Sequence, residues 1–230
     1  MSENPIVELR GIGKSFKGCS VLKDVELSLF RGESISVCGA SGVGKTTLLN
    51  IISLLEQPDL GNIFWNGEMV LNRCAKDIRS LRSSMFGFVF QNHNLIHELN
   101  VIENVLLPLK VRGRISKNDI NFANSLLKAV GIEGKKYETI DVLSGGEKQR
   151  IALARSLVNK PSVILADEPT GNLDEDNANR ALCLMMDICE LNNSSLLLIT
   201  HNQQLAKLTD KTFFLSNGGL SLSESSYLDS

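Results

Sequence analysis

A glycine-rich stretch near residue 40 has the composition and spacing of a phosphate-binding loop. Residues 39–46 read GASGVGKT, between the strand-like run 34–38 and a helical pattern. Glycines let successive backbone N–H groups turn toward phosphate oxygens, and the start of the next helix adds positive potential. In this pattern Lys45 reaches the β- and γ-phosphates and the Thr46 hydroxyl binds Mg²⁺. The predicted phosphate-binding residues are Gly39, Ala40, Ser41, Gly42, Val43, Gly44, Lys45, Thr46 and Thr47.

A second stretch ends an apolar strand with two carboxylates. Residues 163–168 read VILADE, so that Asp167 and Glu168 stand where the strand ends. An aspartate in this position is the usual Mg²⁺-associated acid of P-loop enzymes. A water placed for in-line attack needs a proton acceptor within about 3 Å, and a strand-end carboxylate supplies one. The alternative is a pair of solvated acids with no catalytic role.

A third stretch, LSGGEKQR at residues 143–150, indicates a helix start that faces a ligand. Ser144 and Glu147 have the spacing of a capping box, and two glycines leave backbone amides open to an anion. Alone, the pattern would fit a capped helix with no ligand, and a P-loop alone would fit a kinase, a GTPase or a helicase. GTPases usually carry N-K-x-D, whereas residues 159–162 read NKPS and lack the aspartate.

Together, the three stretches resemble the ABC ATPase family, whose signature is LSGG followed by a polar residue and Gln-Arg. The resemblance covers about residues 6–219 and implies ATP and Mg²⁺ as ligands, with hydrolysis to ADP and phosphate. It implies that Glu168 is the general base or water-positioning group and that Ser144, Gly145 and Gly146 complete the ATP site of a second copy. Catalytic roles fall on Glu168, His201 and Lys45, with Phe16 stacking on adenine and Mg²⁺ binding by Thr46, Gln91 and Asp167.

The resemblance also implies partners. Stretches such as LSGGEKQRIALARSLVNKP and ADEPTGNLDEDNA are similar to the lipoprotein-releasing branch, in a clade shared with macrolide-exporter and cell-division ATPases. This implies an ATP-bound dimer with a second copy, contact with integral membrane permease subunits through the region of Gln91, and a place at the cytoplasmic face of the inner membrane. The segment 172–174 is expected where subunits touch. A cell-division ATP switch or another exporter of the clade shares every catalytic residue and stays open as an alternative.

The elements that must position these groups alternate between strand and helix patterns. Strands are predicted at 6–9, 25–29, 34–38, 63–65, 86–90, 163–166 and 196–200, and helices after the P-loop, from Ser116 to Gly131 and around Ala178–Cys189. We expect an α/β P-loop NTPase (RecA-like) core with an N-terminal antiparallel β portion and an inserted α-helical subdomain. The chain is expected to be one domain over 1–230, with the helical subdomain at about 92–159 and a flexible tail at 221–230.

Composition limits the function classes. The chain has 230 residues, a net charge of −2 and 43% hydrophobic residues, without the basic excess typical of a nucleic-acid partner. No apolar run has the length of a membrane helix, and the N-terminus does not have the pattern of a secretory signal. The five cysteines lack a C-x-x-C pair and mostly lie in apolar runs, which predicts buried, reduced thiols and a cytosolic chain.

Overall fold

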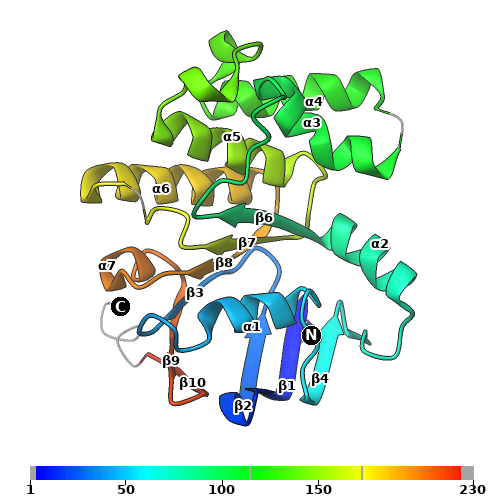
Figure 1. Ribbon diagram of the computed structural model, residues 1–230, viewed down its shortest axis with the longest axis vertical. Helices are drawn as coiled ribbons and strands as arrows, with labels where there is room; N and C mark the ends of the chain where they lie inside the picture. Colours follow the sequence, from blue (N-terminus) through cyan, green and yellow to red (C-terminus); the bar gives the residue numbers. More distant parts are fainter. Residues whose placement is uncertain (1–3, 114, 172, 224–230) are drawn as a thin grey trace. The chain divides into compact units, whose positions relative to one another are not determined.

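A computed structural model describes residues 4–113, 115–171 and 173–223 of the chain. The chain forms two compact units, and Figure 1 labels their elements. The first unit contains the residues up to Arg82 and those from Ser195 onward, and the second unit contains Ser83–Ser194. Helix α2 (Ala75–Met85) runs across the boundary between them in the sequence.

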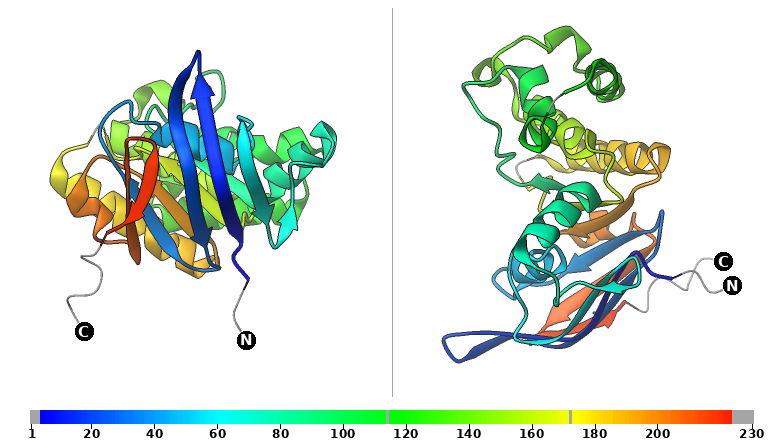
Figure 2. Two further views of the ribbon diagram at one scale, coloured as in Figure 1. Left: turned by 90° about the horizontal axis from the view of Figure 1, so that it is seen from below. Right: turned by 90° about the vertical axis from the view of Figure 1, so that its right-hand side faces the viewer.

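The first unit contains a four-stranded antiparallel sheet in the order β2-β1-β4-β5. Its long strands β1 (Val7–Phe16) and β2 (Cys19–Leu29) run side by side in Figure 2, and a two-residue turn joins them. Both turn residues, Lys17 and Gly18, have positive φ, which suits the right-handed twist of the hairpin. The sheet continues with β4 (Leu60–Trp65) and β5 (Glu68–Met69). This is the N-terminal antiparallel portion that the sequence predicts.

The first unit also contains a mixed group of four strands. Strand β3 (Ser34–Cys38) pairs in parallel with β8 (Ser195–Ile199) on one side and with β9 (Lys211–Ser216) on the other, and β10 (Gly219–Leu222) runs antiparallel to β9. Every residue of β3 and β8 is buried. Such runs are typical of parallel strands covered on both faces. The short helix α7 (Gln203–Ala206) follows β8.

Helix α1 (Lys45–Ile52) follows the P-loop and buries one side in the first unit. Its predicted apolar face is confirmed for Leu48, Leu49, Ile51 and Ile52, which are all buried. The 3.6-residue apolar pattern of the sequence predicts that the helix extends to Leu55, which is wrong, because the helix ends before Ser53 and Leu54 turns to a φ of 52°. The Leu55 side chain is therefore 51% exposed.

The second unit combines one pair of parallel strands with helices. Strands β6 (Phe86–Phe90) and β7 (Val163–Asp167) pair along their whole length. The helices are α3 (Val101–Arg112), α4 (Lys117–Ala129), α5 (Gly145–Leu157) and α6 (Glu175–Leu191), with 3₁₀ turns at Glu133–Lys135 and Ile140–Val142. The predicted start of α4 is confirmed, because Ser116 and Asp119 form a reciprocal capping box. The predicted buried face of α6, with Ala178, Leu182, Met185 and Cys189, is also confirmed.

The segment between β6 and α3 is an irregular loop at residues 91–100, where the sequence pattern predicts a helical region from about residue 92. A single buried side chain, Asn104 of α3, organises its second half. The Asn104 amide donates to the carbonyl oxygens of Ile96, Leu99 and Asn100, and its oxygen accepts from the Ile96 N–H at 2.8 Å. Helices α3, α4 and α5 lie within 92–159, and the subdomain itself stays a prediction.

Three further expectations have mixed outcomes. All five cysteines are free thiols, but only Cys38 and Cys189 are buried, so the expected burial is wrong for Cys19, Cys74 and Cys183. In the predicted flexible tail, Ser221 and Leu222 belong to β10, while residues 224–230 lie outside the described part of the chain. Within the described residues, no helix is both long and apolar enough to span a bilayer.

Replacing Asn104 by alanine should lower the free energy of unfolding by about 1–3 kcal/mol, because buried backbone groups of the 91–100 loop lose their partner. Chemical denaturation of the purified chain measures this change. The control is Asn121→Ala, at an exposed position of α4, which should change the same free energy by no more than about 0.5 kcal/mol. Equal effects of both substitutions would contradict the role given to Asn104.

Candidate functional site

The P-loop of the first unit leaves β3 and enters α1, as the motif predicts. Its glycines are required by sterics: a Cβ on Gly44, whose φ is 112°, would lie 2.5 Å from Cγ1 of Val21. A Cβ on Gly39 would lie 2.6 Å from the carbonyl oxygen of Leu215. The loop backbone therefore packs directly against β2 and β9 at these two positions, which leave no room for a side chain. A glycine loop of this kind fits a phosphate group bound by backbone N–H groups.

Lys45 begins α1 and directs its ammonium group into the curve of the loop. Nζ of Lys45 donates to the carbonyl oxygens of Gly39 at 2.8 Å and Ala40 at 3.0 Å, and the side chain is buried. No side chain caps α1, since its N-cap residue is Gly44. The first turn of a helix without a side-chain cap presents backbone N–H groups to an anion. Thr46, in this first turn, is exposed.

Phe16 lies at the end of β1 with a cation beside its ring. The Phe16 side chain is 44% exposed, and Nζ of Lys14 lies 5.1 Å from its ring centroid. Lys14 is held by Glu56 and Asp59, and the hydrogen bond that the Lys14 ammonium donates to Glu56 raises the pKa of that ammonium. An aromatic ring that is partly exposed and has a cation nearby can stack on a base.

His201 stands directly after β8 in a turn that is fixed by its neighbours. The Asn202 N–H donates to the Thr200 hydroxyl at 3.0 Å, and the Asn202 side chain caps α7 by accepting from the N–H groups of Gln204 and Leu205. The Asn202 amide oxygen is thus the acceptor that begins α7, as is common for asparagine at a helix N-cap. His201 itself is exposed.

In the second unit, the structure brings Gln91, Asp167 and Glu168 to one edge of the β6–β7 pair. Phe90 pairs with Asp167 in the parallel register, so Gln91 and Glu168 follow neighbouring strand ends. Glu168 has a φ of 47°, an uncommon value for a residue with a side chain, and its carbonyl oxygen accepts from the Gly171 N–H at 3.1 Å. A Cβ on Gly171 would lie 2.7 Å from Nε2 of Gln91, so the Gln91 amide lies directly against this glycine.

The LSGG stretch begins α5, and its predicted capping box is confirmed. The Ser144 hydroxyl accepts from the Glu147 N–H, while the Glu147 carboxylate accepts from the Ser144 N–H at 2.9 Å. Lys135 adds a salt bridge to Glu147 at 2.5 Å. This salt bridge, followed by the Ser144 N–H, lowers the pKa of Glu147 to about 2. Gly145 and Gly146 form the first turn, where no Cβ contact would restrict them.

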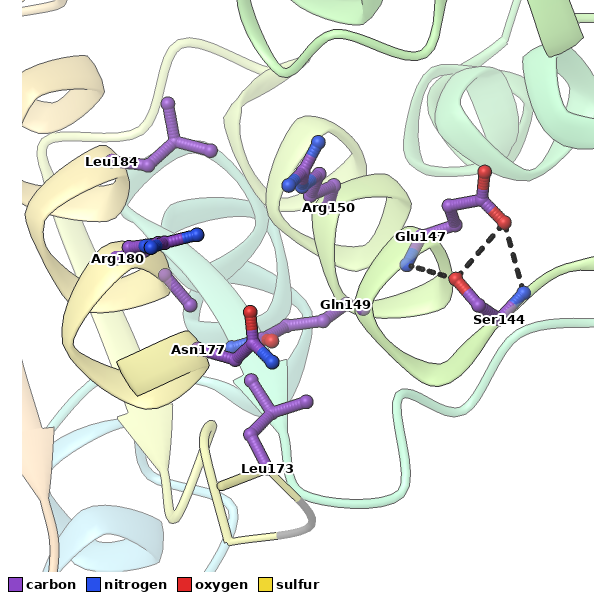
Figure 3. A pocket seen from close by; sticks show the side chains of 10 residues that line it. Ser144, Glu147, Gln149, Arg150, Leu173, Asn177, Arg180 and Leu184 are labelled. Atoms are coloured by element: carbon purple, nitrogen blue, oxygen red, sulfur yellow. Dashed lines mark hydrogen bonds between the residues drawn. The ribbon is translucent and has the colours of Figure 1, made fainter. Parts of the chain in front are cut away.

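A groove of about 470 Å³ lies beside this helix start, within the second unit. Figure 3 shows Arg150 of α5 and Arg180 of α6 on its walls, with Asn177 and Gln149 between the two helices; of these four side chains only Gln149 is buried. Two guanidinium groups in one groove suit an anionic group. The sequence motifs indicate the Ser144 end of this groove but not Arg180, because α6 follows α5 only after a strand and a loop. The groove is lined by Ser144, Gly146, Glu147, Gln149, Arg150, Leu173, Asn177, Arg180, Ala181 and Leu184.

The predicted residues thus fall into two groups. Phe16, the loop 39–47 and His201 belong to the first unit, and Gln91, Ser144–Gly146, Asp167 and Glu168 belong to the second. Of the predicted subunit-contact segment 172–174, Asn172 lies outside the described residues, and the Asp174 side chain caps α6. Sequence reasoning missed Gln149, whose buried amide donates to the carbonyl oxygen of Pro169, next to Glu168. It also missed Arg155, which contacts the loop after Gln91.

Comparisons with known proteins place these motifs in a family. The model of a family described as ABC transporter matches residues 22–171. The chain is 40% identical to a lipoprotein-releasing system ATP-binding protein LolD of Bacteroides thetaiotaomicron, over 93% of this chain and 98% of that protein. Proteins of the same name from Rickettsia bellii and Aquifex aeolicus are 39% and 40% identical, over 96% and 93% of this chain and 99% and 95% of the relatives.

Two solved structures share the fold. A dimeric, post-hydrolysis structure of the ATP-binding cassette MJ0796 bound to ADP and Pi has a TM-score of 0.83 and 33% identity, over 94% of this chain and 96% of that one. The structure of cbiO1 from Clostridium perfringens, part of the ABC transporter complex cbiONQ, has a TM-score of 0.87 and 28% identity, over 96% of this chain and 88% of that one. The predicted fold class is confirmed by these matches.

The charge of Glu147 should stabilise the fold in a pH-dependent way. Its pKa is near 2 in the folded chain, below the ordinary value of about 4.3, so the stabilisation is present above about pH 4.3 and lost as the pH falls toward 2. Glu147→Gln keeps a capping oxygen but removes the charge. In urea denaturation, wild type should exceed this variant in unfolding free energy at pH 5–7, by a margin that shrinks from pH 4 downward. If the difference in unfolding free energy does not change with pH, the Glu147 charge does not stabilise the fold. The control is Glu133→Gln, at an exposed position, which should show no such pH-dependent difference.

Proposed function

The chain belongs to the ABC transporter ATP-binding family and is an ATP-hydrolysing transporter subunit, and from this premise we propose that it drives the release of lipoproteins from a membrane. The observation that carries the proposal is the likeness to three lipoprotein-releasing ATPases over at least 93% of this chain and 95% of each relative. The motifs that support the ATPase chemistry are spread over both units of the chain.

The first unit is proposed to bind the nucleotide. The backbone of residues 39–44 and the Lys45 ammonium hold the β- and γ-phosphates, because the glycine loop and the start of α1 offer N–H groups. Phe16 stacks on adenine through its exposed ring, and Thr47 adds a further polar contact in the first turn of α1. His201 donates a hydrogen bond to the γ-phosphate and steadies it.

Glu168 is proposed to prepare the attacking water. Its carboxylate accepts a proton as the water oxygen forms a bond to the γ-phosphorus, while the bond from that phosphorus to the β–γ bridging oxygen breaks and ADP leaves. The turn from Glu168 to Gly171 and the bond from Gln149 to the Pro169 oxygen hold this carboxylate at the strand end. The reaction is ATP + H₂O to ADP + phosphate.

Magnesium fits the donors that the chain offers. A hydroxyl oxygen of Thr46, a carboxylate of Asp167 and an amide oxygen of Gln91 are hard donors of the kind that Mg²⁺ prefers. When bound, Mg²⁺ neutralises charge on the β- and γ-phosphates. The Gln91 side chain lies against Gly171, the last residue of the turn that begins at Glu168. This closeness supports the proposal that Gln91 and the strand-end carboxylates act at one site.

A second copy of the chain is proposed to complete each ATP site. Ser144, Gly145 and Gly146 present a capped helix start with exposed glycine backbone, beside a groove with two arginines. A γ-phosphate bound in the other copy would meet these backbone amides. The dimeric MJ0796 structures support such an arrangement.

The membrane partner is proposed to be an integral permease that contacts the loop after Gln91, which would place the chain at the cytoplasmic face of the inner membrane. Of the apolar residues in this segment, Val101 and Ile102 are buried and belong to the core. Leu95 and Leu99 are partly exposed and Ile96 is 38% exposed, so these three remain for an interface.

Glu168→Gln should bind ATP but lose turnover, because an amide cannot accept the proton of the attacking water. Steady-state phosphate release is expected to fall by about 10²–10⁴-fold, while binding of a fluorescent ATP analogue stays within about twofold. The control is Glu190→Gln, at an exposed position near the end of α6. If Glu168→Gln keeps more than about a tenth of the wild-type rate, Glu168 is not the base.

Glutamate substitutions at Leu95 and Leu99 should abolish co-purification with a lipoprotein-releasing permease, because two charges would be buried in an apolar contact. The melting temperature and the ATPase rate of the isolated chain should stay near wild type. Val111→Glu, at an 82% exposed position of α3, is the matched control and should leave permease binding intact. Unimpaired binding of the double variant would exclude this surface, and loss of folding would assign both leucines to the core.

A further inference from the structure

Helix α5 of the second unit is attached to β6 by direct backbone contact. A Cβ on Gly87, the second residue of β6, would lie 2.2 Å from the carbonyl oxygen of Ser156. The helix backbone therefore packs against the strand backbone with no side chain between them. Arg155, the residue before Ser156, is thereby held near the strand that leads to Gln91.

The Arg155 guanidinium binds two successive carbonyl groups in the loop after β6. It donates to the oxygen of His93 and to the oxygen of Asn94, each at 2.5 Å. Both residues are in the left-handed region, with φ values of 57° and 48°. Two successive non-glycine residues in this region are uncommon, and of the two only asparagine adopts it readily. The fork of N–H groups on one arginine stabilises this conformation by binding both carbonyls that the turn exposes.

The charged guanidinium of Arg155 has the carbonyl groups of this turn as its partners. Burial is the cause that lowers the pKa of its guanidinium, and within the described part of the chain no carboxylate forms an ion pair with it. A half-buried cation without a carboxylate partner still needs other acceptors for the N–H groups that are withdrawn from water. The two carbonyl groups therefore satisfy N–H groups of Arg155, and Arg155 in turn holds the conformation of the turn.

The two ends of the 91–100 loop have separate anchors. Asn104 binds backbone groups of Ile96, Leu99 and Asn100 at the far end. Arg155 binds the residues two and three positions after Gln91, and Gln91 in turn lies against Gly171. The end of the loop that carries Gln91 thus takes its conformation from α5, the helix that begins at the LSGG stretch.

We propose that Arg155 is a positioning residue for Gln91, which fixes the turn at 92–94 and so holds the Gln91 side chain beside the Glu168–Gly171 turn. The proposal rests on the function proposed for Gln91. It assigns Arg155 no contact with ATP. A merely structural arginine would stabilise the unit without any specific effect on this loop or on turnover.

The test uses Arg155→Lys in the full chain, because lysine keeps the charge but cannot bind two carbonyls in a fork. Hydrogen exchange of peptides covering residues 91–95 should become at least about tenfold faster, while peptides from α3 and α5 stay unchanged. The kcat for ATP should fall by about 10–100-fold, as expected for a misplaced group, with KM for ATP within about twofold. Arg112→Lys, at an exposed position of α3, is the matched control and should change neither quantity.

Gln91→Ala, alone and combined with Arg155→Lys, separates the possible failures. If Arg155 acts through Gln91, the double variant should have the same kcat as Gln91→Ala alone. Unchanged exchange in Arg155→Lys would overturn the proposal, as would faster exchange with unchanged kcat when Gln91→Ala lowers kcat. Full activity of Gln91→Ala would instead refute the proposed role of Gln91, and exchange alone would then decide whether Arg155 holds the turn. Arg155→Met gives a second variant for the exchange measurement should Arg155→Lys fold poorly.

Discussion

Complete burial of short strands is the constraint on which the rest of the structure depends. Strands β3 and β8 bury every residue, and β7 buries all but its last, Asp167. Such strands leave room for polar side chains only where the strand ends and the backbone turns away. The P-loop, the Asp167–Glu168 pair and His201 all follow the ends of these strands. The reactive groups are therefore placed by the same burial that stabilises the sheets.

The predicted nucleotide chemistry divides between the units along the chain. The first unit contains the loop and lysine proposed to bind phosphate, and the second contains the carboxylates and the LSGG helix. Within the second unit, α5 links the groups most directly, through Gln149 to the oxygen next to Glu168 and through Arg155 to the loop after Gln91.

Local chemistry explains what could be predicted from the sequence. Strands β3 and β6 have the predicted bounds because apolar runs end at polar or glycine residues, and both serine capping boxes form as their spacing indicates. The misses come from backbone turns and contacts that hydrophobic periodicity does not encode. Leu55 lies outside α1 because Leu54 turns left-handed, and the 91–100 loop interrupts a helical pattern because Asn104 satisfies its backbone. Arg155 meets residues about sixty positions earlier, a contact that no local pattern encodes.

The contact between Gly87 and Ser156 has a mechanical consequence. Side chains between packed elements yield under load by changing rotamers, whereas two backbones in contact have no such freedom. At the contact of β6 and α5 there is accordingly no side chain whose rotamer could absorb a relative shift of the two backbones. We therefore expect β6 and α5 to move together as one body at this point.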